Sequence, residues 1–457
     1  MECGGKKTAA AIYQEVAREV EGLLRRVFAE RRQTGRVDLE AVEKATRTTL
    51  HRAGAAALSQ LLSGPEVEPR PVDCPCGQKA QYHDRRNKRL LTVVGPVQIE
   101  RAYYVCRHGG QGQAPRDREL DVEGTQCSPG VRRRMAVVGS ETSFEQGREQ
   151  WEALAGLQVT AQAVERQAEA IGSNIGVQEQ AEIHQAMQGD RPPACRGPEI
   201  PVLYIEMDGT GVPVVAAETK GRPGKVAGQP ARTREAKRGC VFTQTGVDRD
   251  GRPVRDKEST TYTGAMETAE EFGQRLYAEV WNRGGSRAKK KVVSGDGAPW
   301  IGNLAGEHFP GAIEIVDLSH ARQHLWELSA KLFPPERARK RWAGKLQRML
   351  DRGKIAGVVQ ALRPFPPPRP ELADLLDQEA DYFAHNAPRM RYPNFRAQGL
   401  FVGSGVVEAG CKSVIAARLK RSGMFWTVRG ANAILALRCC RLSKGFEDYW
   451  ESRPRAA

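Results

Sequence analysis

Two short apolar segments in this chain each end in an aspartate that is followed by glycine. Val202–Met207 precedes Asp208-Gly209, and Val292–Gly295 precedes Asp296-Gly297. Apolar runs of this length, bounded by glycine, are typical of buried β-strands. Asp-Gly most often marks a turn, and Asp250-Gly251, which lies among charged residues, is interpreted as a turn only. We therefore expect the first two aspartates to lie at the open edge of a sheet.

The order of predicted elements indicates an α+β multidomain protein with a ribonuclease-H-like, mixed-sheet catalytic core. Along the chain, such a core has three strands, a helix, a strand, a helix and a strand. The predicted strands are residues 202–207, 239–245, 259–262, 291–294 and 313–318, and the first predicted helix is residues 265–281. The chain that follows is helical with proline interruptions and is too long for a loop. We expect a core of residues 200–320 and 400–450 with a helical insertion domain at 321–399.

A third carboxylate completes a candidate metal site. Glu408 lies in Gly403–Lys412 and begins a helical stretch. Two aspartates at strand ends and a glutamate from a helix can hold two magnesium or manganese ions, because hard cations prefer oxygen ligands. Such a metal pair activates an attacking oxygen and stabilises the leaving oxygen of a phosphodiester. The predicted catalytic ligands are therefore Asp208, Asp296 and Glu408.

His320 is a further catalytic candidate. It closes the sequence Asp317-Leu318-Ser319-His320 at the end of the fifth predicted core strand. One interpretation is a capping or core histidine. The other is a group that handles a proton or orients a phosphate beside the metals.

The charge of the chain predicts a polyanionic partner, double-stranded DNA. The 457 residues carry a formal net charge of +15, although surface lysines alone can produce such a balance. The basic clusters can also be ordinary solvated faces, and an aromatic residue among them can belong to the core. The predicted DNA-binding residues are Arg132, Arg133, Arg134, Lys412, Arg418, Lys420, Arg421 and Trp426.

The N-terminal half is predicted to hold smaller modules. Residues 1–65 repeat apolar positions at helical spacing, which favours a helical region. Residues 125–190 are also predicted to be helical. The two helices at 144–154 and 160–171 have the outline of a helix-turn-helix, and a helical connector is the alternative interpretation.

Residues 72–112 are predicted to form a zinc-ribbon-like β-hairpin module. Two strands joined at Gly95-Pro96 lie between Cys74-Pro75-Cys76 and Cys106-Arg107-His108. Two ligand pairs around a hairpin are typical of a zinc ribbon, so the expected ligands are Cys74, Cys76, Cys106 and His108. His83 is a substitute ligand, and a small β-unit with buried cysteines is the alternative.

Neither membrane insertion nor export is expected. No apolar run approaches the roughly 20 residues that span a bilayer, and residues 1–7 are polar rather than a signal peptide. The ten cysteines are then interpreted as reduced thiols or metal ligands, not as a disulfide framework. We expect a cytoplasmic, nucleoid-associated protein.

From Met207 to about Trp450 the chain resembles the ISKra family of bacterial insertion-sequence transposases. The resemblance rests on Met207–Thr210, Gly239–Thr245, Gly295–Ala298, Val316–Trp326, Gly403–Lys412 and Phe446–Trp450.

The resemblance implies a DDE transposase that cuts DNA at the terminal inverted repeats of a transposon and joins the ends to target DNA. Asp208, Asp296 and Glu408 match the acidic triad, and Asp317 with His320 matches an Asp-x-x-His element. A homodimer or higher homo-oligomer is expected, because a mobile element has two ends. The alternatives are a structure-directed nuclease without strand joining, a domesticated DNA-binding regulator, and an accessory subunit of a larger complex.

Overall fold

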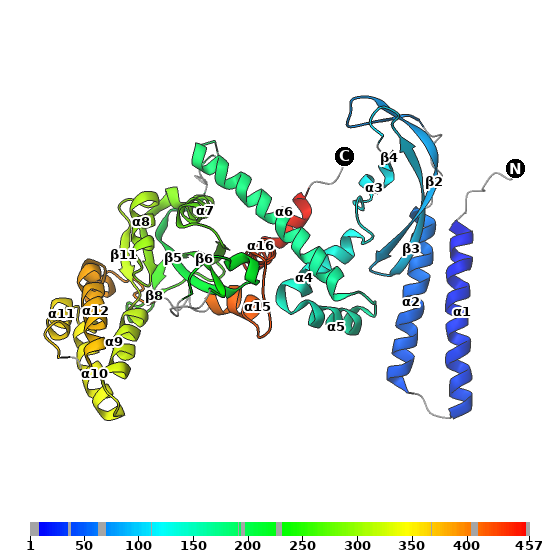
Figure 1. Ribbon diagram of the computed structural model, residues 1–457. Helices are drawn as coiled ribbons and strands as arrows, with labels where there is room; N and C mark the ends of the chain where they lie inside the picture. Colours follow the sequence, from blue (N-terminus) through cyan, green and yellow to red (C-terminus); the bar gives the residue numbers. More distant parts are fainter. Residues whose placement is uncertain are drawn as a thin grey trace. The chain divides into compact units, whose positions relative to one another are not determined.

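The computed structural model describes residues 9–34, 38–62, 70–110, 112–190, 192, 197–224, 231–366, 368–403 and 410–453 (Figure 1). Contacts divide the chain into two compact units, Met1–Ala168 with Asp448–Ala457, and Glu169–Glu447. None of the described helices is long and apolar enough to cross a membrane.

The first unit begins with two long helices and an antiparallel hairpin sheet. The hairpin turns at Gly95, whose φ of +111° is a conformation that favours glycine. Ala55 of the second helix packs on Leu90, Val97 and Ile99 of the hairpin. The elements are α1 (Ala9–Thr34), α2 (Leu39–Leu62), β1 (Val72–Asp73), β2 (Lys79–Thr92), β3 (Gly95–Val105) and β4 (Gly112–Gln113), in the sheet order β1-β2-β3-β4.

Further helices of this unit are α3 (Pro115–Glu119), α4 (Pro129–Glu141), α5 (Phe144–Ala155) and the start of α6 (Ala161–Gln188). The Ser128 and Ser143 hydroxyls accept backbone N–H groups at the first turns of α4 and α5, which satisfies donors that the helix leaves unpaired. Gly156 ends α5 at φ +67°. Met135, Trp151 and their neighbours bury the apolar faces of these helices in one cluster.

A mixed sheet is the centre of the second unit. Its strands are β5 (Ile200–Pro213), β6 (Thr233–Gln244), β9 (Thr261–Ala265), β10 (Ala288–Gly295) and β11 (Ile313–Val316). The order is β11-β10-β5-β6-β9. The pairs β5–β6 and β6–β9 are antiparallel, whereas β10 is parallel to both β5 and β11. Beside it, β7 (Gly246–Val247) and β8 (Pro253–Val254) form a small hairpin.

Helices cover both faces of this sheet, as Figure 1 shows. Leu203 and Ile205 point to one face, where they pack with α7 (Ala269–Asn282) and α8 (Pro299–His308). Val202 and Tyr204 point to the other face and a second core. Both faces of β5 are buried, which explains why its sequence is an almost continuous apolar run.

The chain after β11 adds the helices of the insertion to the second core. They are α9 (Leu318–Leu332), α10 (Glu336–Asp351), α11 (Ile355–Leu362), α12 (Ala373–Asn386) and α13 (Tyr392–Ala397). Leu325, Leu346 and Phe383 from this region share one buried cluster with Val292 and Phe242 of the sheet. The insertion therefore stabilises the sheet directly through a common core.

The C-terminal part of the second unit returns to the sheet. It comprises a π-helical segment (Cys411–Ala416), α15 (Ala417–Leu419), α16 (Val428–Leu442) and the first residues of α17 (Phe446–Ser452). α16 packs closely on α6. A Cβ added to Gly172 would collide with the carbonyl oxygen of Ala433. The close approach requires glycine at residue 172.

Candidate active site

Asp208, Asp296 and Asp317 lie level with one another on three adjacent parallel strands. Asp296 and Asp317 directly follow β10 and β11, whereas Asp208 lies within β5 and not at its expected end, because pairing with β6 continues to Pro213. Ser294 of β10 pairs with Glu206 of β5, which places Asp296 opposite Asp208 two residues further on. Gly295 pairs with Val316 of β11, and the Asp317 amide continues the ladder by donating to the Gly295 carbonyl at 2.8 Å. The register thus brings together the two aspartates predicted from the strand-Asp-Gly pattern.

Asp208 is held by a buried arginine that the sequence did not mark as functional. Arg238, on the neighbouring strand β6, pairs directly with Asp208, and its Nη2 lies 3.5 Å from Asp208 Oδ2. The Arg238 side chain is 1% exposed and that of Asp208 is 21% exposed. The arginine therefore balances the aspartate charge from inside the protein and leaves one side of the carboxylate open to solvent.

Asp296 is positioned by its own turn and by the insertion. Its Oδ1 accepts the Ala298 amide at 2.8 Å, and its backbone carbonyl accepts the Tyr382 hydroxyl at 2.8 Å. Gly297 has a φ of +89°, and an added Cβ there would lie 3.1 Å from the Tyr382 ring and 3.2 Å from Nδ2 of Asn386. Helix α12 thus packs against the Asp296 turn so tightly that glycine is required.

Asp317 holds His320 at the same edge of the sheet. The fully buried carboxylate caps α9 by accepting the Ser319 and His320 amides. His320 Nδ1 lies 3.7 Å from Asp317 Oδ2. The nearby Asp317 carboxylate raises the pKa of His320, and the charges of Asp296 and Asp208 raise it further. The capping interpretation thus applies to Asp317, and His320 faces the carboxylates.

Glu408 lies outside the described residues, but both flanks of its segment are described. On one side, the Leu318 amide donates to the Val402 carbonyl at 2.9 Å, next to Asp317. On the other side, a Cβ added to Gly410 would lie 2.8 Å from Nη1 of Arg238. The chain therefore leaves the described structure beside Asp317 and re-enters it beside the arginine that contacts Asp208.

The basic residues after Gly410 divide into exposed and buried groups. Lys420 is exposed, and its Nζ donates to Thr210, two residues beyond Asp208 on β5. Arg421 donates to the Ala417 carbonyl at 2.7 Å. The structure corrects the expectation for Arg418 and Trp426. Both are buried, with the guanidinium 4.8 Å from the centre of the indole ring, so neither is accessible to DNA.

The other predicted DNA contacts lie in two separate places. Lys412 lies in the π-helical segment, and its side chain is outside the described part. In the other unit, Arg132 is bound to Asp121 by an ion pair of 2.6 Å, whereas Arg133 is half-buried and Arg134 is exposed. Arg132 therefore supports the packing of α4, which leaves Arg134 as the most accessible member of this cluster.

The predicted zinc ligands come together in part. The Sγ atoms of Cys74, Cys76 and Cys106 lie within 4.8 Å of one another, the only such group of three potential ligands among the described residues. His108 is not a member of that group. His83 lies 3.3 Å from Asp84 and is not a member either. The Gly109 amide donates to Cys106 Sγ at 3.5 Å, which lowers the pKa of that thiol.

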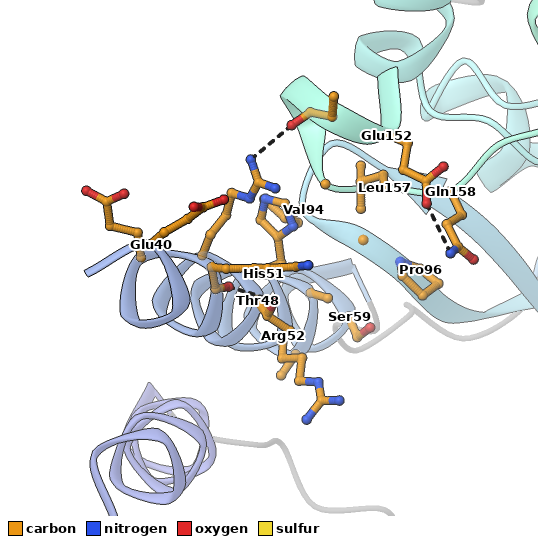
Figure 2. Close-up of a pocket in the computed structure, with 18 residues that line it drawn as sticks. Glu40, Thr48, His51, Arg52, Ser59, Val94, Pro96, Glu152, Leu157 and Gln158 are labelled. Carbon is orange, nitrogen blue, oxygen red and sulfur yellow. Dashed lines mark hydrogen bonds between the residues drawn. The ribbon is translucent and has the colours of Figure 1, made fainter. Parts of the chain in front are cut away.

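A cavity of about 1100 Å³ lies in the first unit, between α2, the hairpin turn and the end of α5 (Figure 2). Arg47 donates to the carbonyls of Ala153 and Leu154 at 3.4 and 3.5 Å. A cation at these last carbonyls of α5 is a favourable partner for the helix dipole. The lining side chains have both charge signs and include Glu40, His51 and Glu152. We interpret this cavity as a gap between packed elements of the unit and not as a binding site.

Comparison with known proteins identifies the family. The model of the "Uncharacterised protein family (UPF0236)" matches residues 32–365. The chain belongs to UPF0236. A relative from Streptococcus gallolyticus, the "UPF0236 protein in vanSb 3'region", is 23% identical over 391 residues, which are 81% of this chain and 76% of the relative.

A solved structure, the "Drosophila P element transposase strand transfer complex", is distantly similar to this UPF0236 chain. The match covers 74% of this chain and 84% of that structure's chain, with 9% identity and a TM-score of 0.25. A likeness this distant carries no argument about the fold or activity of the UPF0236 protein. Any functional conclusion therefore depends on the register and contacts of the protein's own residues.

Two supporting residues were missed from the sequence, for different reasons. Arg238 directly precedes the apolar run Gly239–Phe242. A charged residue beside a predicted buried strand could therefore have marked it as a functional candidate. Tyr382 lies 86 residues from Asp296, in a helix whose pattern shows only that one face is buried. No local signal distinguishes it from an ordinary core tyrosine.

Proposed function

We propose that this UPF0236 protein is a DDE transposase, which cuts DNA at transposon ends and joins the ends to target DNA by metal-dependent phosphodiester chemistry. The observation that carries the proposal is the alignment of Asp208, within β5, with Asp296, directly after the parallel neighbouring strand β10. The resemblance to the ISKra transposases supports the assignment of these two residues to an acidic triad.

The sheet topology supports a ribonuclease-H-like core. Three antiparallel strands, β5, β6 and β9, are followed by the parallel strands β10 and β11, and the spatial order is β9-β6-β5-β10-β11. Helix α7 connects β9 with β10, and α8 connects β10 with β11. The order of strands and helices along the chain is the one that the sequence predicts for such a core. The spatial order puts the first and fourth of these strands side by side with their aspartates level.

Glu408 is the proposed third member of the triad. A residue two positions from Gly410 has its Cα within about 7 Å of the Gly410 Cα. Gly410 itself packs on Arg238, which contacts Asp208. Chain length therefore permits the Glu408 carboxylate to reach the two aspartates.

The donor set fits magnesium or manganese. Two carboxylates at one edge and a third within reach are the oxygen ligands that hard cations prefer. When bound between them, two such ions would stabilise the charge that develops on the attacking and leaving oxygens of a phosphodiester. Asp208, Asp296 and Glu408 would hold the ions, and Arg238 keeps the Asp208 carboxylate oriented.

The remaining residues act on protons and phosphates. His320, whose pKa is raised by Asp317, can donate a proton to a phosphate oxygen or a leaving group. Lys420, which contacts Thr210 of β5, and Arg421 directly follow α15, where they would contact the DNA backbone. Lys412 and Arg134 remain in the proposed DNA-binding set.

The proposal is tested by conservative substitutions at the two aspartates. Asp296→Asn retains an oxygen that can accept the Ala298 amide, so the turn should persist while a ligand charge is lost. The substrate is a duplex that carries the DNA flanking each end of the gene, incubated with Mg²⁺ or Mn²⁺. We expect Asp208→Asn and Asp296→Asn to reduce cleavage at least about 100-fold, since metal sites are sensitive even to changes around their ligands.

Binding of the same duplex should change little, because phosphate contacts from basic residues supply most of the affinity. Asp250→Asn is the matched control, because Asp250 also precedes glycine but lies in an exposed turn. Undiminished cleavage by Asp296→Asn would refute the triad. Cleavage without joining to a target plasmid would indicate a structure-directed nuclease, and wild-type binding without cleavage would indicate a regulator.

The active particle is proposed to be at least a dimer, since one triad forms one metal site and a transposon has two ends. The basic run Arg337–Arg341 on α10 supplies exposed charge at Arg337, Lys340 and Arg341, which could contact the partner's DNA end. Light-scattering mass of the complex with end DNA tests this. A strictly monomeric and fully active complex would contradict it.

A further inference from the structure

A cluster of thiols lies in the first unit and has no part in the proposed phosphodiester chemistry. Cys74 and Cys106 are buried, and Cys76 is exposed. Cys76 Sγ lies 3.5 Å from Cys106 Sγ, and all three sulfurs lie within 4.8 Å of one another. A disulfide requires about 2.05 Å between sulfurs and uses two of them, so the observed spacing and number favour a shared ligand.

Two tight turns shape the cluster. The first is closed by the Gly77 amide, which donates to the Cys74 carbonyl at 2.9 Å, and the second by the Gly110 amide, which donates to the Cys106 carbonyl at 2.9 Å. Gly77 and Gly110 have φ values of +81° and +59°, which favour glycine. The two turns lie together at the open end of the hairpin, one before β2 and the other after β3.

Gly109 brings backbone against the sulfurs. Its amide donates to Cys106 Sγ, and a Cβ added to it would lie 3.4 Å from Cys76 Sγ and 3.7 Å from Cys74 Sγ. An N–H group aimed at a sulfur favours the thiolate, which is the form that binds metal. The backbone of this turn therefore lies against all three sulfurs and donates to one of them.

The packing around the thiols is too small to order this end of the hairpin strongly. The buried cluster contains only Cys74, Ala80, Ala102, Tyr104 and Cys106 among the described residues, and the strands that flank the hairpin, β1 and β4, have two residues each. Small modules with so little apolar core generally depend on a metal or disulfides.

We propose that Cys74, Cys76 and Cys106 bind one zinc ion as thiolates and that His108 provides the fourth ligand. Zinc in structural sites takes four nitrogen or sulfur ligands. His108 is exposed in the same turn as Cys106 and Gly109, so its ring can turn toward the sulfurs. On binding, each thiol releases its proton to solvent, and no electrons are transferred.

The test uses the full chain, purified from zinc-supplemented cultures without chelators. Elemental analysis should find about one zinc per chain in the wild type and less than about a tenth in Cys76→Ser. Cys76 is the first choice because it is exposed, so serine there loses little packing. Cys127→Ser is the matched control, since Cys127 lies in the same unit and outside the thiol group.

Cobalt substitution gives a readout that does not depend on activity. The sulfur-to-cobalt absorption of the wild type should weaken by about a third in Cys76→Ser if that variant still takes up cobalt, because one of three thiolates is lost. His108→Ala should retain the absorption of three thiolates but lose zinc to a chelator about tenfold faster or more.

Several results would overturn the proposal. Wild-type protein with less than about a tenth of a zinc per chain would do so, as would equal zinc content in Cys76→Ser and Cys127→Ser. A Cys76–Cys106 disulfide, detected by mass spectrometry of the unreduced protein, would replace the metal with a covalent bridge. Identical chelator resistance of His108→Ala and wild type would remove His108 from the ligand set.

Discussion

Replacing Tyr382 by phenylalanine should weaken both the fold of the second unit and the proposed chemistry. The Tyr382 hydroxyl donates to the backbone carbonyl of Asp296 at 2.8 Å. Its ring stacks on His324 with the ring centres 4.0 Å apart. Phenylalanine retains the ring and its stacking and removes only the donor.

The expected loss of stability comes from that single hydrogen bond. One intramolecular hydrogen bond contributes about 1 kcal/mol, and an acceptor left without a partner in a buried site costs about 1–3 kcal/mol. We therefore expect the free energy of unfolding to fall by about 1–3 kcal/mol. Because the carbonyl belongs to the same residue as a proposed metal ligand, cleavage should slow as well, by about tenfold for each 1.4 kcal/mol that is lost from the transition state.

Tyr392→Phe is the control for this experiment. Tyr392 is another tyrosine of the insertion and is fully buried, and its hydroxyl has no hydrogen-bond partner among the described residues. Burial raises the pKa of both Tyr382 and Tyr392 above the ordinary value. Removing an unpaired buried hydroxyl is expected to be neutral or stabilising, so this variant should retain wild-type stability and cleavage.

Denaturant unfolding followed by circular dichroism measures the stability of each variant, and equal m-values show that the unfolded states are comparable. Cleavage of the flanking-DNA duplex measures activity. If Tyr382→Phe is as stable as the wild type, or if both variants lose the same free energy, the hydroxyl does not hold the Asp296 turn. Either result would refute the proposed support of Asp296 by the insertion.

Three further predictions concern single contacts. Arg238→Lys should still reduce cleavage at least about tenfold, because an ammonium cannot reproduce the planar guanidinium beside Asp208; wild-type rates would contradict this. Gly297→Ala should destabilise the second unit by more than about 1 kcal/mol, because its φ of +89° is unfavourable for alanine, and unchanged denaturant midpoints would contradict it. Burial lowers the pKa of His308 below its ordinary value of 6.5, so the unfolded chain binds a proton that the folded chain does not, and stability should fall as the pH drops from about 6.5 through the folded pKa. His308→Leu should flatten this pH dependence, whereas His385→Leu, at an exposed histidine, should leave it unchanged.

The sequence predicted the sheet well because its strands are buried on both faces. The alternation of Leu203 and Tyr204 between two cores produces a continuous apolar run, which is recognisable without tertiary information. The aspartates could be located for the same reason, since each directly follows such a run. Predicted strand ends were less accurate: β5 extends to Pro213, beyond the expected residue 207, because pairing with β6 continues past the buried part.

Long-range contacts could not be predicted in this way. The arginine that contacts Asp208 lies on a different strand, and the tyrosine that supports Asp296 belongs to the insertion. Neither relation leaves a periodic pattern, because each depends on which surfaces meet after the chain has folded. Among the expected zinc ligands, similarly, residue spacing suggested four, whereas the folded hairpin brings together the sulfurs of Cys74, Cys76 and Cys106.

The segment after Gly410 departs from the regular helix that the sequence predicts. The sequence prediction assumed a regular helix after Glu408, in which basic residues spaced by multiples of about four share one face. The structure instead has a π-helical segment at Cys411–Ala416, where hydrogen bonds span five residues and the rotation per residue is smaller. Residues after that segment are therefore shifted around the axis. Arg418 turns inward to the ring of Trp426, and Lys420 reaches Thr210 on the strand that carries Asp208. After the π-helical turn, Lys420 is thus exposed beside Thr210, whereas Arg418 is buried.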